Sequence, residues 1–337
     1  MFLLKRSSMS FCITNRREAI AAIASIIGAT STPSAWAQPA PHYPSRPVKM
    51  ITGGSAGGTS DLLGRVIGER FAKAWGQPCV SEARPGANQA IAIKAVATDV
   101  PDGHSLFLGT TAYTLNLALR KDAIYGPNDL VPLSHLATAP TVLTVPASLG
   151  VDTLDQFLKL IRAEPGKFSY GSTGTGSAPH VNGEMLSLST KSRLIHVPYK
   201  GESALITDLV AGTLAAAYGS AQIMGPLAKA GKLKLLAVTG DKRLPALPDV
   251  PSSAELGHPM LTGYWGLWTT AGTPTATVRK IADETRRVIA IPEVAQQILG
   301  MGFLPIGSGP EEFAAFLEVE FKRWKAAADA TNISLKD

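Results

Sequence analysis

A glycine-rich loop that joins an apolar strand to an amphipathic helix constrains the fold of this chain more than any other segment. The loop covers residues 53–61, with the sequence GGSAGGTSD. Residues 48–52 before it predict a strand, and the apolar residues after it recur at helical spacing until Gly76. A helix that begins in such a loop leaves backbone N–H groups unpaired, and the positive end of its dipole points outward. The segment therefore predicts an α/β unit with an anion-binding site at the loop.

The composition indicates a globular protein that is long enough for two domains. The 337 residues are 45% apolar and 17% charged, with no low-complexity tract, which argues against a disordered chain. The formal net charge is +6, but half of this excess lies in the first 37 residues. The remaining basic residues are scattered along the chain, so we expect no nucleic-acid partner.

The N-terminus has the pattern of a secretory signal peptide. Arg16 and Arg17 precede an apolar stretch at residues 19–28 that is too short to span a bilayer, and residues 35–37 form an A-x-A cleavage site. We expect residues 1–37 to be removed by cleavage after Ala37. The twin arginines leave export by the Sec and Tat routes both open.

Cysteine and histidine usage predicts neither a disulfide nor a metal site. Only Cys79 would remain after removal of the signal peptide, which rules out an intrachain disulfide and a cysteine-based metal site. The histidines lie far apart in sequence, without the spacing of metal ligands. We expect no metal and no cofactor, and a periplasmic location for the exported chain.

Strands alternate with helices along the chain, which predicts mostly parallel sheets covered on both faces. Strands are expected at residues 77–82, 105–109, 143–145, 168–170, 194–197, 214–218, 233–238 and 265–270. Helices are expected at residues 89–97, 153–163, 203–211, 274–289, 292–299 and 310–328.

A second loop of the same kind lies at residues 171–177, with the sequence GSTGTGS. It opens a helix in which Pro179 suits the first position, where its missing N–H group costs nothing. A third strand-to-helix junction follows at residues 199–202. Because ligands bind at the carboxyl ends of strands in open α/β sheets, such loops would line a single cleft if two domains faced each other.

Two enzymatic interpretations of the first loop are weaker than the binding interpretation. Residues 53–57 match the G-x-S-x-G pattern of a serine hydrolase, with Ser55 as nucleophile. The match comes too early in the mature chain for the strands and the oxyanion loop that precede such a serine. Gly53 and Gly58 have P-loop spacing, but Thr59 stands where a lysine is required. We therefore expect a protein that is not an enzyme, with a secreted hydrolase using Ser55 as the alternative.

Four further side chains have expected roles near these loops. His180, in the first turn of the helix behind the second loop, is expected to hold that loop by a backbone hydrogen bond, with direct contact to the ligand as the alternative. Tyr113 is expected either in the core or as a wall of the pocket. Trp265 and Trp268 are expected to pack at the hinge.

Several short segments, in this order, are typical of one protein family. They are YPSRP at 43–47, EARPGA at 82–87, PDGH at 101–104, HVPYKG at 196–201, LPALPDVP at 244–251, AGTP at 271–274 and PEEF at 310–313. On these segments the mature chain resembles the Bug family, the periplasmic solute receptors of tripartite tricarboxylate transporters, over nearly its whole length.

The resemblance implies the fold of a type II periplasmic binding protein, in which two α/β lobes close on a ligand about a hinge. The implied boundaries are residues 38–141 with 265–337 for the first lobe and residues 142–264 for the second. The implied ligand is a small organic carboxylate, either a dicarboxylate, a tricarboxylate or an aromatic acid, and acidic amino acids are also compatible with amide-lined loops. A monomeric receptor would deliver it to the membrane subunits of a transporter, or alternatively to a signalling partner.

In this family a ligand carboxylate is held by backbone amides and water rather than by an arginine. The implied contacts in the first lobe are Ser55, Ala56, Gly57, Gly58, Thr59, Thr110 and Thr111. Those in the second lobe are Ser172, Thr173, Gly174, Gly176, Ser177, Lys200, Gly201, Gly219 and Ser220.

Two positions depart from the family pattern. An aromatic residue is usual where this chain has Gly54, and an aspartate is common where it has Gly219. Both changes remove side-chain volume, and the second removes a charge. They predict a roomier pocket that is less suited to an amine-bearing ligand.

Overall fold

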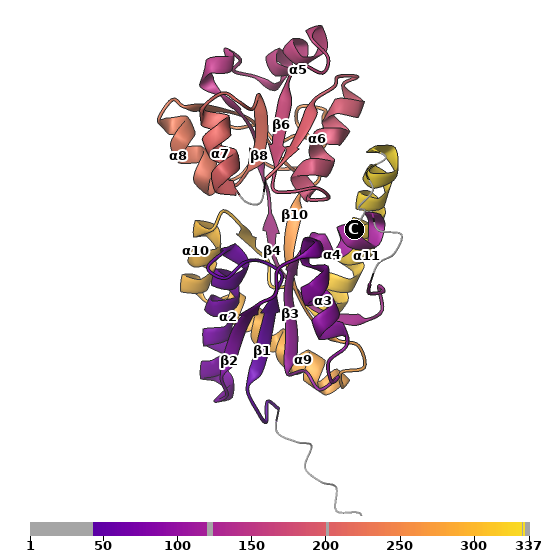
Figure 1. Ribbon diagram of the computed structural model, residues 1–337. Helices are drawn as coiled ribbons and strands as arrows, with labels where there is room; N and C mark the ends of the chain where they lie inside the picture. The colour runs from indigo at the N-terminus through magenta and orange to yellow at the C-terminus, as the bar shows by residue number, and fades with distance from the viewer. Residues whose placement is uncertain (1–42, 120–123, 200–201, 332, 334–337) are drawn as a thin grey trace, which may run out of the picture. The chain divides into compact units, whose positions relative to one another are not determined.

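The computed structural model describes residues 43–119, 124–199, 202–331 and 333. The predicted signal peptide and the Lys200-Gly201 turn lie outside the described residues. Two α/β lobes are joined by β4 (Leu130–Ala139), which leads into the second lobe, and by β10 (Gly263–Thr270), which belongs to the first (Figure 1). This is the architecture expected of a periplasmic binding protein.

The first lobe has a six-stranded sheet in the order β11-β4-β10-β3-β1-β2. Its remaining strands are β1 (Val48–Thr52), β2 (Cys79–Ala83), β3 (Ser105–Thr110) and β11 (Leu304–Pro305). β1 pairs in parallel with β2 and β3, whereas β10 lies antiparallel between β3 and β4.

The second lobe has a five-stranded sheet in the order β7-β6-β8-β5-β9. Its strands are β5 (Val142–Pro146), β6 (Ser169–Ser172), β7 (Ile195–Pro198), β8 (Ala216–Gly219) and β9 (Leu233–Val238). β6 pairs in parallel with β7 and β8, and β5 lies antiparallel between β8 and β9.

Each sheet therefore contains three parallel strands followed by one antiparallel strand that arrives from the other lobe. The expectation of mostly parallel sheets is therefore wrong, because both sheets are mixed. Strands β5 and β10 enter their lobes from the junction and run away from it, whereas the three parallel strands of each lobe run toward it. Strand β5 begins at Val142 and strand β10 at Gly263. The boundaries inferred for the lobes stay a prediction.

The helices lie between the strands and at the C-terminus. They are α2 (Thr59–Trp75), α3 (Ala90–Ala97), α4 (Ala112–Leu119), α5 (Leu154–Ala163), α6 (Ala178–Ser189), α7 (Glu202–Val210), α8 (Ala221–Lys229), α9 (Thr275–Ile289), α10 (Pro292–Gly300) and α11 (Pro310–Thr331). Short 3-10 turns occupy Ala87–Gln89 and Ala147–Leu149. All helices predicted from the sequence are present.

Four elements were not predicted, namely β4, β11, α4 and α8. Strand β4 carries Pro132 and alternates little, and α8 contains Gly225 and Pro226. Proline and glycine lower helix propensity, so the sequence of α8 by itself favours a turn. Tertiary packing overrides this preference, since Met224 of α8 is fully buried.

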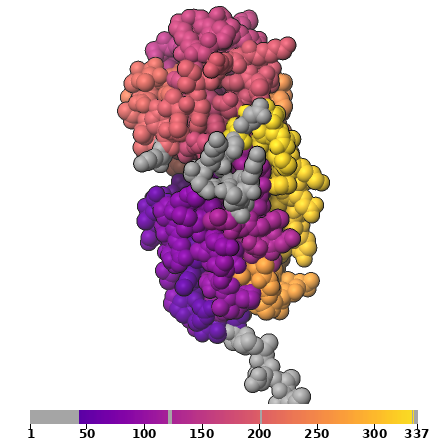
Figure 2. Space-filling model, turned by 45° about the vertical axis from the view of Figure 1, so that its right-hand side comes forward, coloured from indigo at the N-terminus to yellow at the C-terminus, as the bar shows by residue number. Residues whose placement is uncertain are grey.

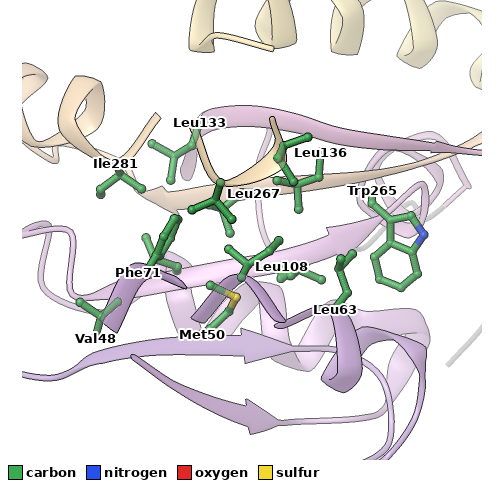
Figure 3. Close-up of a cluster of buried hydrophobic side chains, with 14 of the residues drawn as sticks. Val48, Met50, Leu63, Phe71, Leu108, Leu133, Leu136, Trp265, Leu267 and Ile281 are labelled. Carbon is green, nitrogen blue, oxygen red and sulfur yellow. The ribbon is translucent and has the colours of Figure 1, made fainter. Parts of the chain in front are cut away.

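The core of the first lobe forms where the buried face of α2 meets the sheet. Leu63, Ile67 and Phe71 recur every four residues on α2 and are completely buried. They pack with Met50 of β1 and Leu108 of β3, among others (Figure 3). Burying a side chain of this size stabilises the fold by about 1.5–3 kcal/mol. This packing holds the N-terminus of α2, and the loop before it, against the sheet.

The C-terminal helix α11 contacts both lobes. It packs on α4 and β4 of the first lobe and on α6 of the second, and Figure 2 shows it in yellow alongside both. Trp324 of α11 is fully buried in a cluster that includes Leu115, Val181 and Leu261. None of the helices in the described part of the chain is long and apolar enough to cross a membrane.

Candidate functional site: a cavity lined by six loops

A cavity of about 950 Å³ is lined by residues from both lobes. Its wall comes from the loops that follow β1, β2 and β3 in the first lobe and β6, β7 and β8 in the second. Crossover residues at 139–141 and 263–265 complete it, together with Met301 and Phe303. The carboxyl ends of six parallel strands thus converge on one space, where α/β sheets bind ligands.

The wall is rich in helix N-termini and poor in positive side chains. Helices α2, α4, α6 and α8 each begin in or next to a lining loop. Among the described lining residues there is no lysine and no arginine. The first N–H groups of a helix have no partner within it, and its dipole favours a negative charge. An anion in this cavity would therefore be held by peptide dipoles rather than by a side-chain cation.

The first glycine loop divides into a part that faces the cavity and a part that braces it. Ser55 and Thr59 line the cavity, whereas Ala56, Gly57 and Gly58 do not. The Gly57 N–H group donates to Asp61 Oδ2 at 2.9 Å, and the Gly58 N–H group donates to the Ser55 carbonyl at 3.0 Å. The predicted donors at residues 57 and 58 are thus already used within the loop.

The buried carboxylate of Asp61 organises this bracing. In addition to the hydrogen bond from the Gly57 N–H group, Asp61 accepts a hydrogen bond from Ser81 Oγ at 2.7 Å. It also forms an ion pair with Arg65. These hydrogen bonds, that from Gly57 first, lower the pKa of Asp61 below its usual value. The carboxylate therefore joins the loop, helix α2 and strand β2.

Thr110 and Thr111, both predicted as contacts, line the cavity and also hold neighbouring segments. Thr111 exchanges two hydrogen bonds with the backbone of Tyr264 in the returning crossover: its N–H group donates at 3.2 Å and its Oγ1 accepts at 2.9 Å. Thr110 Oγ1 accepts a hydrogen bond from Gln89 Nε2 at 3.0 Å. The loop after β3 is therefore tied to the hinge and to the loop after β2.

The loop after β2, residues 85–89, lines the cavity but was not predicted as part of the site. Ala87, Asn88 and Gln89 all have positive φ, at 46°, 49° and 71°. Consecutive non-glycine residues in this region are costly and are typical of functional sites. Asn88 Nδ2 lies 3.5 Å from the Gly176 carbonyl of the other lobe. The Pro85-Gly86 pair at the end of a strand is the sequence signal that could have identified this loop.

In the second glycine loop, Thr173, Gly174 and Ser177 line the cavity, while Ser172 and Gly176 lie beneath its surface. The Gly176 N–H group donates to His180 Nδ1 at 3.1 Å, which confirms the role predicted for that histidine. Ser172 Oγ accepts from the Gly174 N–H group at 3.1 Å and lies 2.6 Å from His196 Nε2. Burial lowers the pKa of each histidine to about 4, so both are neutral at neutral pH.

Gly219 and Ser220 also line the cavity, and Gly54 lines it on the side of the first lobe. A Cβ atom on Gly219 would lie 2.1 Å from Met224 Cε and 2.9 Å from Glu202 Oε1. A Cβ atom on Gly54 would lie 2.7 Å from Ser60 Oγ. The chain's own side chains thus lie beside both glycines, and one of them is the carboxylate of Glu202. The prediction of a roomier pocket stays a prediction.

The remaining predicted residues fall in several places. Lys200 and Gly201 lie outside the described residues, and their contact with a ligand stays a prediction. Tyr113 is buried in the core against Trp268, whereas Trp265 packs on Phe303 and lines the cavity. Among the described lining residues there is no histidine that could activate Ser55.

Comparison with known proteins identifies the family of this chain. The family model described as a tripartite tricarboxylate transporter family receptor matches residues 63–333. A UPF0065 protein in the tcbD-tcbE intergenic region of a Pseudomonas species is 32% identical over 315 residues, covering 92% of this chain and 93% of the relative. Protein BugT of Bordetella pertussis is 28% identical over 299 residues, covering 87% and 92%.

Two similar solved structures contain small acids. An R. palustris protein with adipate is 29% identical, with a TM-score of 0.78, covering 87% of this chain and 99% of that one. MatC from Rhodopseudomonas palustris with bound malate is 26% identical, with a TM-score of 0.74, covering 85% and 99%. The family and its structural neighbours are solute-binding receptors rather than enzymes. This chain therefore belongs to the receptor family of the tripartite tricarboxylate transporters, the Bug-type periplasmic solute-binding proteins.

Proposed function

We propose that this protein captures a small organic carboxylate in the cavity between its lobes. The observation that carries the proposal is the convergence of helix N-termini on a cavity whose described lining contains no lysine or arginine. A carboxylate accepts several hydrogen bonds and suits such a wall. The similar structures with adipate and with malate support the same class of ligand.

The expected affinity follows from the number of amide contacts. Each charge-assisted hydrogen bond from an N–H group to a carboxylate is worth roughly 1.5–3 kcal/mol. Three or four such bonds, less the cost of immobilising the ligand, give micromolar affinity or better, on the order of −8 kcal/mol. Binding requires no covalent chemistry.

Closure of the lobes requires only that the ligand contact both of them. The closed state then gains contacts that the open state lacks, and the ligand shifts the equilibrium toward it. The loops after β1 and β3 would hold one side of the ligand, through residues such as Ser55, Thr59 and Thr110. The loops after β6 and β8 would hold the other, through residues such as Thr173, Ser177 and Ser220.

The closed receptor, a monomer in the periplasm, would deliver its ligand to the membrane subunits of a tripartite tricarboxylate-type transporter. The family match supports this partner. Cleavage after Ala37 would release the mature chain, and N-terminal sequencing of the protein recovered from the periplasm tests that site. Light scattering of the purified mature protein tests the monomer.

A thermal-shift screen tests the binding proposal. The mature protein is heated with a panel of dicarboxylates, tricarboxylates, aromatic acids and amino acids, and positive compounds are titrated by calorimetry. A ligand that binds only the folded state at about 100 times its Kd stabilises that state by about 2.7 kcal/mol and raises the Tm. A panel in which no carboxylate raises the Tm would overturn the proposal.

A further inference from the structure

A single carboxylate side chain lies in the wall of the cavity. Glu202 is the first residue of α7, and it lines the cavity together with Gly219 and Ser220. Its Oε1 atom accepts a hydrogen bond from the Ser220 N–H group at 2.5 Å. This N–H group belongs to the residue that precedes α8, so Glu202 occupies a helix N-terminus that would otherwise be open to an anion.

Among the described residues, only one of the two carboxylate oxygens of Glu202 has a short hydrogen bond. Oε2 has a hydroxyl contact with Ser220 Oγ at 3.4 Å, which is long for a hydrogen bond between oxygens. Apart from Tyr199, Tyr218 and Tyr264, every other described lining residue is non-ionisable, so none of them supplies a compensating cation. Closure around a ligand would remove water from this oxygen, and an unpaired carboxylate in a dry site is costly.

We propose that Glu202 determines specificity by pairing with a protonated amine on the ligand. This inference rests on the proposed function, because the ligand's carboxylate is held at the amide-lined loops while its ammonium group faces Glu202. A carboxylate repels a second carboxylate of the ligand and attracts a cationic donor. The ligand class is therefore an amino acid or a related amino carboxylate, and a plain dicarboxylate of the same length binds more weakly.

The proposal reverses the expectation drawn from Gly219 alone. A glycine at that position suggests a wall without charge, but Glu202 Oε1 lies 2.9 Å from the place that a Cβ atom on Gly219 would take. Residues 202 and 219 are 17 positions apart in the sequence and adjacent in the wall. The negative charge comes from the loop after β7 instead of from the end of β8.

The test compares ligands that differ in one group, using calorimetric titration of the mature protein. The pairs are γ-aminobutyrate against succinate, aspartate against succinate, and glutamate against glutarate. The variant is Glu202→Gln, whose side-chain oxygen still accepts from the Ser220 N–H group. The control is Glu293→Gln, which removes the same charge from an exposed position on α10. Thermal unfolding of each variant checks that it is folded.

In the wild type, the better amine-bearing ligands are expected to bind at least about tenfold more tightly than their amine-free partners, which corresponds to about 1.4 kcal/mol. Glu202→Gln is expected to bring this ratio to about one and to strengthen dicarboxylate binding, a gain that misfolding does not produce. Glu293→Gln is expected to keep the wild-type ratio.

Equal or tighter binding of the amine-free acids by the wild type would overturn the proposal. So would a ratio that Glu202→Gln leaves unchanged while the Tm falls, because Glu202 would then serve only to cap α8. If dicarboxylates bind well and amines do not matter, the proposed function stands and only this inference fails. If neither kind of compound binds, the proposed function fails and the inference fails with it.

Discussion

The imidazole rings of His180 and His196 stack face to face beneath the second glycine loop, with centroids 3.8 Å apart and an angle of 18° between their planes. His180 accepts a hydrogen bond from the Gly176 N–H group, and His196 contacts Ser172 Oγ. Each ring thus supports a different residue of the loop. Two charged imidazoles at this separation would repel each other, so the arrangement disfavours the state in which both rings are protonated.

Acidification is expected to destabilise the protein through this pair. Burial lowers the pKa of both histidines from 6.5 to about 4 in the folded state, and for His196 the charge of His180 adds to the effect. Between pH about 6.5 and 4 the unfolded chain therefore binds more protons than the folded one. The stabilisation is complete above pH 6.5 and is lost as the pH falls toward 4. Urea unfolding at pH 7 and at pH 4.5 measures this difference.

Two variants distinguish the contribution of the second glycine loop to acid destabilisation from that of the rest of the molecule. His196→Gln removes one of the two titrating groups and is expected to reduce the loss of stability on acidification. His135→Phe removes another histidine with a pKa of about 4, but it lies in the first lobe against Phe316. His135→Phe is also expected to reduce the loss of stability on acidification. Because His135 does not contact the second glycine loop, this variant is expected to leave the pH dependence of ligand affinity unchanged. An acid response of stability that is the same in all three proteins would contradict this account.

Removal of the Asp61 carboxylate is expected to weaken both the fold and ligand binding. Asp61→Ala leaves the Gly57 N–H group and the Ser81 hydroxyl without their shared acceptor, which costs about 2 kcal/mol. The first glycine loop loses its brace, so the affinity for ligand also falls. Glu69→Ala on the same helix removes an exposed ion pair with Lys73 and is expected to change little. Equal effects of the two substitutions on urea unfolding would show that Asp61 has no special role.

Gly53→Ala is expected to disrupt the site with a single methyl group. A Cβ atom on Gly53 would lie 2.4 Å from the Cβ and Cγ atoms of Gln89, so Gln89 must move. Its hydrogen bonds with Thr110 would then be lost. We expect ligand affinity to fall at least about tenfold, or 1.4 kcal/mol.

Gly300→Ala is the matched control for this substitution. Gly300 ends α10, and a Cβ atom there meets no atom within 4 Å. Alanine is a better helix former than glycine, so this change is expected to be neutral or slightly stabilising. Calorimetric titration that finds wild-type affinity in Gly53→Ala would show that the loops after β1 and β2 adjust independently.

Asn182→Ala is expected to loosen the crossover that returns to the first lobe. The buried Asn182 side chain donates to the Leu261 carbonyl at 2.8 Å and accepts from the Leu261 N–H group at 2.9 Å. Its removal leaves both backbone groups buried and unpaired, at a cost of roughly 2–4 kcal/mol. Urea unfolding measures the loss.

Replacement of Asn182 by aspartate tests the donated and the accepted hydrogen bond separately. Asn182→Asp keeps the acceptor for the Leu261 N–H group but places a carboxylate next to the Leu261 carbonyl. We expect it to be at least as destabilising as alanine, because like partial charges then face each other in a buried site. If aspartate restored wild-type stability, the donated hydrogen bond would be unimportant.

Most elements of the fold could be predicted because their signals are local. The strand, glycine loop and helix at residues 48–76 lie within a few residues of the expected bounds, and Gly76 caps the end of α2 with a left-handed φ of 67°. The hydrogen bond from the Gly176 N–H group to His180 joins residues only four positions apart, so it could also be predicted.

The unpredicted parts of the site depend on contacts between distant segments. Gln89 was expected as the start of a helix, but its side chain binds Thr110, 21 positions later. Glu202 enters the wall beside Gly219 only because β7 and β8 lie on either side of β6 in the second sheet. Neither neighbour can be inferred from the spacing of apolar residues.

The sequence by itself determined the strand–loop–helix units and the family. Those properties depend on neighbours within one or two helical turns. Only the tertiary structure decided which loops meet, since the chain crosses twice between lobes and the decisive contacts join segments as far apart as Thr111 and Tyr264. It also placed a carboxylate in the cavity wall, because Glu202 Oε1 lies 2.9 Å from the position that a Cβ atom on Gly219 would take.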